Sequence, residues 1–165
     1  MEASDDKSEL LGLIIKSLET ELTGILKSAE SAYQGATHED AVSKSKYETH
    51  GLELSYLAGS QFERARILRQ QILSLTNKDL KVYENSDEIA AEALVTLISP
   101  ENQEHHYLIY SIGAGLKLDL HGKTVQVISP QSVIGNELIG AYLEDTIFIE
   151  RGSNKLEEWK VNAIG

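Results

Sequence analysis

The chain has 165 residues, of which 41% are hydrophobic and 25% are charged, and its formal net charge is −11. This length fits one ordinary domain or two small units, and the hydrophobic fraction is enough to bury a core. The acidic balance argues against duplex DNA as a partner, because that binding depends on Lys and Arg neutralising phosphates. No run approaches the ~18 apolar residues of a membrane span, and the acidic start lacks the pattern of a secretory signal. The absence of cysteine excludes disulfides and thiolate metal sites, and we expect a cytoplasmic protein that contacts no membrane.

The first predicted element is a long helix that begins near Ser4, which together with Asp5 and Asp6 supplies a cap and first-turn acids. An alternation of four- and three-residue steps over about three heptads favours a coiled-coil partner. Gly35 is expected to end the helix. The apolar seam consists of Leu11, Ile15, Leu18, Leu22, Ile25, Ala29 and Ala32.

A second long helix is predicted to follow a turn of two or three residues, with Thr37 and Asp40 resembling a capping box. So short a turn makes neighbouring helices antiparallel, and small seam residues let them approach closely. We therefore predict an antiparallel coiled-coil hairpin over residues 1–77, with its tip at about 35–40. The second seam consists of Tyr47, Gly51, Leu54, Ala58, Gln61, Ala65, Leu68, Ile72 and Leu75.

A polar connector over residues 78–86 separates this hairpin from a second region, residues 87–165, in which the apolar period becomes that of β-strands. A short helix over 133–138, capped by Ser132 and ended by Gly140, is also predicted. An antiparallel sheet with one short helix makes the fold class α+β. The predicted strands are 93–98, 105–112, 123–128, 146–149 and 158–164.

The run from Val127 to Gly140, VISPQSVIGNELIG, resembles the same part of the Gre family of transcription factors (GreA and GreB). In that family a strand, a serine-proline turn and a short helix precede an acidic turn, here Glu144 and Asp145. The order of coiled coil and C-terminal domain is also similar. The resemblance implies a fold like that of FK506-binding proteins (FKBP-like) for residues 87–165. It also implies a monomeric bacterial protein that docks this domain on RNA polymerase and inserts its coiled coil in the secondary channel.

The resemblance also implies a role for the hairpin tip. Asp40 and Glu39 would supply carboxylates near the RNA 3′ end, where they share Mg²⁺ with the polymerase and stimulate its own nuclease on backtracked RNA. Hard cations of this kind prefer carboxylate oxygens. The chain would then be no enzyme and would have no cofactor of its own. Ser43 stands where the family has a second tip acid, and basic Lys44 follows it.

The family docking motif Ser-Pro-x-Ala-Arg corresponds to residues 132–136, so Ser132, Ile134 and Asn136 are the predicted polymerase-docking residues. Its proline and arginine are replaced here by Val133 and Asn136.

Each candidate also has a purely structural explanation. Glu39 and Asp40 suit the first turn of any helix, and Trp159 alternates with Val161 as core residues do. His105 and His106 are expected to be exposed at a hairpin edge. The basic residues of the second helix can form a solvated face with i,i+3 and i,i+4 partners, or a strip that faces RNA or the channel. They are Lys44, Lys46, Arg64, Arg66 and Arg69.

Three alternative functions are left open. A non-cleaving competitor would only occupy the polymerase channel. A peptidyl-prolyl isomerase or chaperone would need a pocket rich in aromatic residues, of which the C-terminal region has few. A plain coiled-coil adaptor would depend on the helix seams and not on the tip.

Overall fold

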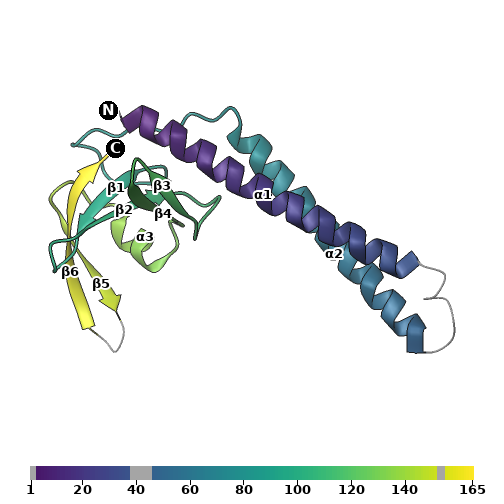
Figure 1. Cartoon of the computed structure of the whole chain (residues 1–165). Helices are drawn as coiled ribbons and strands as arrows, with labels where there is room; N and C mark the ends of the chain where they lie inside the picture. Colours follow the sequence, from purple (N-terminus) through teal and green to yellow (C-terminus); the bar gives the residue numbers. More distant parts are fainter. Residues whose placement is uncertain (1–2, 38–45, 152–154) are drawn as a thin grey trace. The chain divides into compact units, whose positions relative to one another are not determined.

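The computed structural model describes residues 3–37, 46–151 and 155–165. Contacts divide the chain into two compact units, which we call the hairpin unit (residues 15–78) and the sheet unit (residues 1–14 and 79–165). Helix α1 contributes residues to both. The elements of the described ranges are α1 (Ala3–Thr37), α2 (Lys46–Leu75), β1 (Leu94–Ile98), β2 (Glu104–Ile109), β3 (Lys117–Leu120), β4 (Lys123–Ile128), α3 (Val133–Leu138), β5 (Thr146–Arg151) and β6 (Lys155–Ile164) (Figure 1).

The hairpin unit consists of two helices that run side by side in opposite directions, as predicted (Figure 1). Small residues such as Ala58 and Ala65 are almost fully buried on α2, so the helices approach closely there. The buried side chains occupy the predicted seams: Leu18, Ile25, Ala29 and Ala32 on α1, and Ala58, Ala65, Leu68 and Leu75 on α2. Over the residues whose burial is described, the periodicity of the sequence therefore identified the contact faces correctly.

The ends of the two helices differ from the prediction. α1 continues through Gly35 to Thr37, because a glycine costs a helix only about 1 kcal/mol and does not stop it by itself. Thr37 is therefore the last residue of α1 and not the cap of a second helix, and Asp40 lies outside the described residues. At the other end α1 begins at Ala3, so Ser4 lies within the helix.

The sheet unit is built on six strands in the order β3-β4-β2-β1-β6-β5. The predicted hairpin of β1 and β2 is present, with Val95 opposite Tyr107. Four of the five strand pairings are antiparallel, but β2 and β4 pair in parallel, so the sheet is mixed and not purely antiparallel. The parallel pair arises because β3, which was not predicted, reverses the chain before β4. The α+β class is confirmed.

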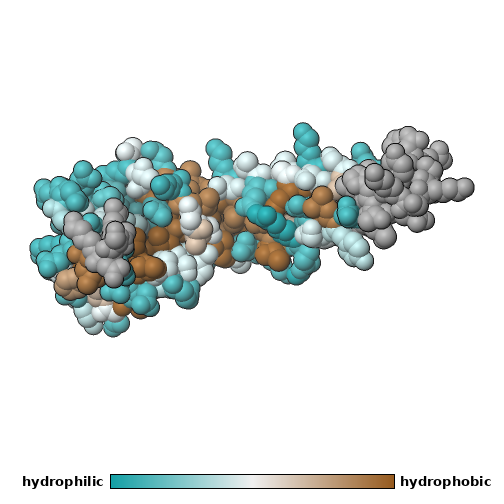
Figure 2. Space-filling model, turned by 90° about the horizontal axis from the view of Figure 1, so that it is seen from below, coloured by the Kyte–Doolittle hydropathy of each residue, from teal (hydrophilic) through white to brown (hydrophobic). Residues whose placement is uncertain are grey.

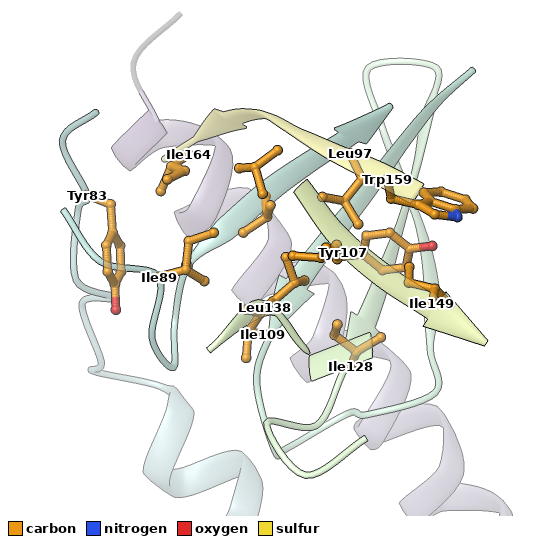
Figure 3. Close-up of a cluster of buried hydrophobic side chains, with 14 residues drawn as sticks. Tyr83, Ile89, Leu97, Tyr107, Ile109, Ile128, Leu138, Ile149, Trp159 and Ile164 are labelled. Atoms are coloured by element: carbon orange, nitrogen blue, oxygen red, sulfur yellow. The ribbon is translucent and has the colours of Figure 1, made fainter. Parts of the chain in front are cut away.

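One face of the sheet packs against α3 and forms the main core (Figure 3). Trp159 is 1% exposed, as its alternation with Val161 predicted, and Leu138 of α3 is fully buried. Tyr83 also belongs to this core, and its hydroxyl donates a hydrogen bond to the Ala91 carbonyl at 2.7 Å. The expected connector therefore contributes an ordered core residue.

The other face of the sheet is covered by the first residues of α1. Ile14 approaches Gly113 so closely that a Cβ at this glycine would lie 2.9 Å from the Ile14 side chain. Leu10 and Ile14 are fully buried. We predicted that all of residues 1–77 belong to the hairpin. In the structure, residues 1–14 group with the sheet unit. The described residues include no helix long and apolar enough to cross a membrane.

Candidate functional site

Of the predicted tip, residues 35–37 belong to α1, and residues 38–40 lie outside the described residues. Glu39 and Asp40, which were expected to bind Mg²⁺, belong to the undescribed range, as do Ser43 and Lys44. Within the described ranges, no group of three or more His, Cys, Asp or Glu side chains could hold a metal ion. The candidate sites that the structure describes are therefore the predicted docking surface around α3 and the sides of the hairpin.

The turn before α3 is held by a network of serine hydrogen bonds. The Ser132 hydroxyl donates to the Ser129 carbonyl at 2.7 Å and accepts from the Gly135 amide at 3.1 Å. Ser132 is therefore the N-cap of α3, as predicted. Since its hydroxyl is engaged on both sides, its first role is to fix the direction of the short helix.

Gly135 is required by this turn. A Cβ at Gly135 would lie 2.2 Å from the Ser129 carbonyl oxygen and 2.9 Å from the Ser132 hydroxyl. The Gre motif has alanine at this place, and alanine does not fit the turn as it is built here. The tight approach of residue 135 to residue 129 therefore favours glycine at position 135 of this chain.

The other residues of the predicted docking motif divide between core and surface. Ile134 packs against the main core, so it supports the helix from inside. Asn136 is exposed, and Val133 is 68% exposed. Ile139 and Tyr142 follow with exposed fractions of 40% and 45%. The surface that α3 offers to a partner is therefore mixed apolar and polar, and no charged side chain stands at positions 132–136.

The acidic turn after α3 is used mainly inside the sheet unit. Asp145 accepts a hydrogen bond from the Tyr142 amide at 2.8 Å, and Glu144 forms an ion pair with Lys160 of β6. Glu144 also has a positive φ of 72°, which a tight turn imposes.

The basic residues of α2 are partly neutralised. Arg64 forms an ion pair with Glu21 of α1 at 2.5 Å, and Arg66 makes a two-pronged contact with Glu63 one turn earlier. The hydrogen bond from Arg66 lowers the pKa of the Glu63 carboxyl. Arg64 and Arg66 therefore belong to partnered faces of the hairpin and not to a free basic strip. Lys44 lies outside the described residues.

The sides of the hairpin also expose large apolar side chains, visible among hydrophilic ones in Figure 2. Tyr56 and Leu73 are 78% and 73% exposed, and Leu57, Phe62 and Ile67 are each about 45% exposed. Apolar residues therefore lie on several sides of α2 and are not confined to the seam that packs against α1. An arm of this kind has apolar surface left for a partner that encloses it.

The adjacent histidines were expected to be exposed, and this is wrong. Both are partly buried: the His105 ring lies 4.8 Å from the Trp159 ring, and His106 Nδ1 lies 2.9 Å from the Thr96 hydroxyl. Burial, followed by the nearby charge of Lys123, lowers the pKa of His106. The two histidines are partly buried because β2 is an inner strand of the sheet, with β4 on one side and β1 on the other.

A cluster of polar contacts that sequence reasoning missed fixes the start of α1 to the sheet. Lys7 is 1% exposed, donates to the Lys81 carbonyl and lies 4.8 Å from the centre of the Tyr83 ring. Burial lowers the pKa of Lys7 to about 8. His121 Nε2 lies 3.4 Å from a carboxylate oxygen of Asp6 and of Glu9. The spacing of Lys7 from Leu11 and Ile14 could have placed it on the buried stripe.

Comparisons with known proteins give a likeness of low strength. No protein-family model matches the sequence, and no curated protein matches it significantly. GreA factor homolog 1 (Gfh1) of Thermus thermophilus is 18% identical with a TM-score of 0.39, over 96% of this chain and 94% of that one. Gfh1 of Thermus aquaticus is 17% identical with a TM-score of 0.39, over 99% and 97%. The transcription elongation factor GreA/GreB of Nitrosomonas europaea is 14% identical with a TM-score of 0.38, over 71% and 91%. At these values the likeness does not assign the chain to a family.

Proposed function

We propose that this protein is a Gre-like regulator of bacterial RNA polymerase. It docks through the sheet unit and inserts the helical hairpin in the secondary channel of the polymerase. The observation that carries the proposal is the hairpin, a pair of long antiparallel helices whose buried seam alternates alanine with leucine and isoleucine. Helix α2 alone, with 30 residues, is about 45 Å long at 1.5 Å per residue. Its natural use is to carry the residues at its tip to a distant place.

The α3 turn supports the docking half of the proposal. The run that resembles the Gre family, residues 127–140, forms the expected strand, serine-capped turn and short helix. Val133 and Asn136 would contact the polymerase, while Ser132 and Ile134 hold α3 in place. Since the motif lacks its arginine, the contact would depend on apolar burial and amide hydrogen bonds more than on charge.

The tip decides which of two activities follows. Asp40, assisted by Glu39, would supply carboxylate oxygens to Mg²⁺ in the polymerase site, and the polymerase would then cut backtracked RNA. Alternatively, Ser43 in place of a second acid leaves the tip unable to hold the ion, and the protein acts only by occupying the channel. Both activities need the same docking and the same hairpin.

The test uses backtracked elongation complexes of a bacterial RNA polymerase that carry 5′-labelled RNA. RNA shortening and protein binding are measured in the same samples, for the natural chain and for Asp40→Ala. Binding with shortening that Asp40→Ala abolishes supports the cleavage variant, and binding without shortening supports the occupying variant. Absence of binding at saturating protein would overturn the proposal.

Two further variants sharpen this test. Glu53→Ala removes an exposed acid of α2 away from the tip and is expected to behave as the natural chain. Ser43→Asp restores the acid spacing of the family motif and is expected to raise the rate of shortening. If Ser43→Asp changes nothing while binding is intact, the spacing of the tip acids is not what limits cleavage.

A further inference from the structure

The hairpin unit has two flanks, one on each side of its buried seam, and they differ in chemistry. One flank is marked by the ion pair between Glu21 of α1 and Arg64 of α2, which join the two helices across the edge of the seam. We call it the ion-pair flank. The residues that α1 contributes to this flank are small or polar, among them Ser17, Glu21, Gly24 and Ser28.

On α1 the opposite flank is a stripe of four large apolar side chains. Spacings of seven, four and seven residues bring each of them back to the same side of a helix with 3.6 residues per turn. Leu26 directly follows the seam residue Ile25 and is turned about 100° from it, whereas Glu21 is turned about 40° the other way. Three of the four side chains are half-buried, and Tyr33 is 54% exposed. The stripe consists of Ile15, Leu22, Leu26 and Tyr33.

Helix α2 adds two exposed apolar side chains to the same flank. Arg64 directly precedes the seam residue Ala65 and is turned about 100° from it, whereas Phe62 is turned about 60° the other way. Leu73 follows Phe62 by eleven residues, which is close to three full turns. Because Arg64 lies on the ion-pair flank, Phe62 and Leu73 lie on the opposite one, with exposed fractions of 45% and 73%. We call this side of the hairpin, formed by these two residues and the α1 stripe, the apolar flank.

The charged residues beside the apolar flank have opposite signs on the two helices. On α1 they are Glu19 and Glu30, and on α2 they are Arg66 and Arg69. Arg66 is partnered by Glu63, whereas Arg69 forms no ion pair with any residue of the described ranges. A protein with a net charge of −11 repels copies of itself, so a self-contact needs matched charges of this kind.

A two-fold axis parallel to the helices matches these charges, because it places α1 of one copy over α2 of the other. Every neighbouring pair of helices is then antiparallel, as in a four-helix bundle. Glu21 and Arg64 lie at the same height, so Glu19, two residues earlier, is level with Arg66, two residues later. In the paired hairpins Glu19 of each copy is therefore level with Arg66 of the other. An axis across the helices would set α1 against α1, and acid against acid.

The face that includes the apolar flank is large enough for a stable dimer. Residues 15–37 of α1 extend for about 35 Å, and two helices side by side are about 20 Å wide. Such a face measures about 700 Å² on each copy, or about 1,400 Å² in total, which is within the usual range of specific interfaces.

We propose that the apolar flank binds the apolar flank of a second copy, so that two hairpins form a four-helix homodimer. This differs from the monomer that the resemblance to the Gre family implies. The inference does not depend on the proposed function. Only one consequence rests on that function: the dimer must separate before a single hairpin can enter the polymerase channel.

Sedimentation velocity of the full chain over a concentration series measures the equilibrium between monomer and dimer. We expect Phe62→Gln combined with Leu73→Gln to weaken dimerisation at least tenfold. The matched control combines Tyr56→Gln with Ile67→Gln, which are also eleven residues apart and are 78% and 44% exposed on the side of α2 away from α1. The control is expected to keep the natural dissociation constant. Because glutamine is a good helix former and all four side chains are exposed, each variant should fold, and circular dichroism checks this.

A charge exchange tests the arrangement of the two copies. Glu19→Lys places a positive charge level with Arg66 of the other copy, and we expect it to weaken dimerisation about tenfold, because the two-fold axis repeats the change. Adding Arg66→Glu to the same chain restores opposite charges and should recover most of the affinity.

Three results would overturn the proposal. The first is a natural chain that stays monomeric at every concentration. The second is an equal loss of dimer in the Tyr56 and Ile67 control, which would indicate non-specific association of apolar surface. The third is a Glu19→Lys protein that dimerises as well as the natural chain or better, or whose loss Arg66→Glu does not restore.

Discussion

Replacing Gly135 by alanine tests the packing on which the proposed docking surface is built. The new Cβ would lie 2.2 Å from the Ser129 oxygen, more than 1 Å inside ordinary contact. The same oxygen accepts hydrogen bonds from the Ser132 hydroxyl at 2.7 Å and the Ser132 amide at 3.0 Å. The turn must therefore open, and the cap of α3 is strained or lost.

The expected cost follows from three contributions. Forcing a methyl group into a packed site costs about 1–3 kcal/mol, and each weakened hydrogen bond costs about 1 kcal/mol. The better helix propensity of alanine returns about 1 kcal/mol. We expect Gly135→Ala to lower the unfolding free energy of the sheet unit by about 2–4 kcal/mol.

Urea unfolding followed by Trp159 emission measures this change, because Trp159 reports on the sheet unit alone. Gly12→Ala is the matched control: Gly12 is an exposed residue of α1 in the same unit, and a Cβ there meets nothing within 4 Å. We expect it to raise the unfolding free energy by about 0.5–1 kcal/mol. A Gly135→Ala protein as stable as Gly12→Ala would refute the close approach of residues 129 and 135.

Three further predictions concern stability. Burial lowers the folded pKa of Lys7 to about 8 from 10.5, so between these values the unfolded state holds more protons and the unfolding free energy rises with pH. Between pH 8 and pH 9.5, the unfolding free energy measured with urea should rise by roughly 1–2 kcal/mol in the natural chain but not in Lys7→Met. The same rise with pH in both proteins would contradict this prediction. Ser132→Ala removes the cap of α3 and should cost about 1 kcal/mol by the same assay, whereas Ser132→Asp should keep most of the stability. A double-mutant cycle of Glu21→Ala and Arg64→Ala should give a coupling below about 1 kcal/mol that disappears in 1 M salt, because both side chains are well exposed. A larger, salt-resistant coupling would count against that reasoning.

The regular parts of the fold could be predicted from the sequence because burial imposes a period on it. The apolar seam from Leu18 to Ala32 indicates which face of α1 packs against α2. The alternation around Trp159 indicates which face of β6 is buried in the core. Ser132 was predictable as a cap because few residue types accept the free amides of a helix start. Such local rules do not need the rest of the chain.

Long-range features could not be predicted in the same way. Strand β3 is only four residues long and follows a glycine-rich break, so its alternation was too short to recognise. The burial of Lys7 depends on Lys81 and Tyr83, which lie more than 70 residues away. The requirement for glycine at 135 depends on a carbonyl placed by the preceding turn. In each case the deciding partner is brought into contact only by the tertiary fold.

The most direct measurement of the central claim locates the hairpin tip on the polymerase. The chain has no cysteine, so Asp40→Cys provides a single attachment point for a photoactivated cross-linker. Asn162→Cys places the same group on an exposed residue of β6 and serves as the control. Our proposal predicts that the probe at position 40 cross-links to the 3′ end of backtracked RNA in an elongation complex and that the probe at position 162 does not. Polymerase binding with no cross-link from position 40 to the RNA or to the lining of the secondary channel would contradict it.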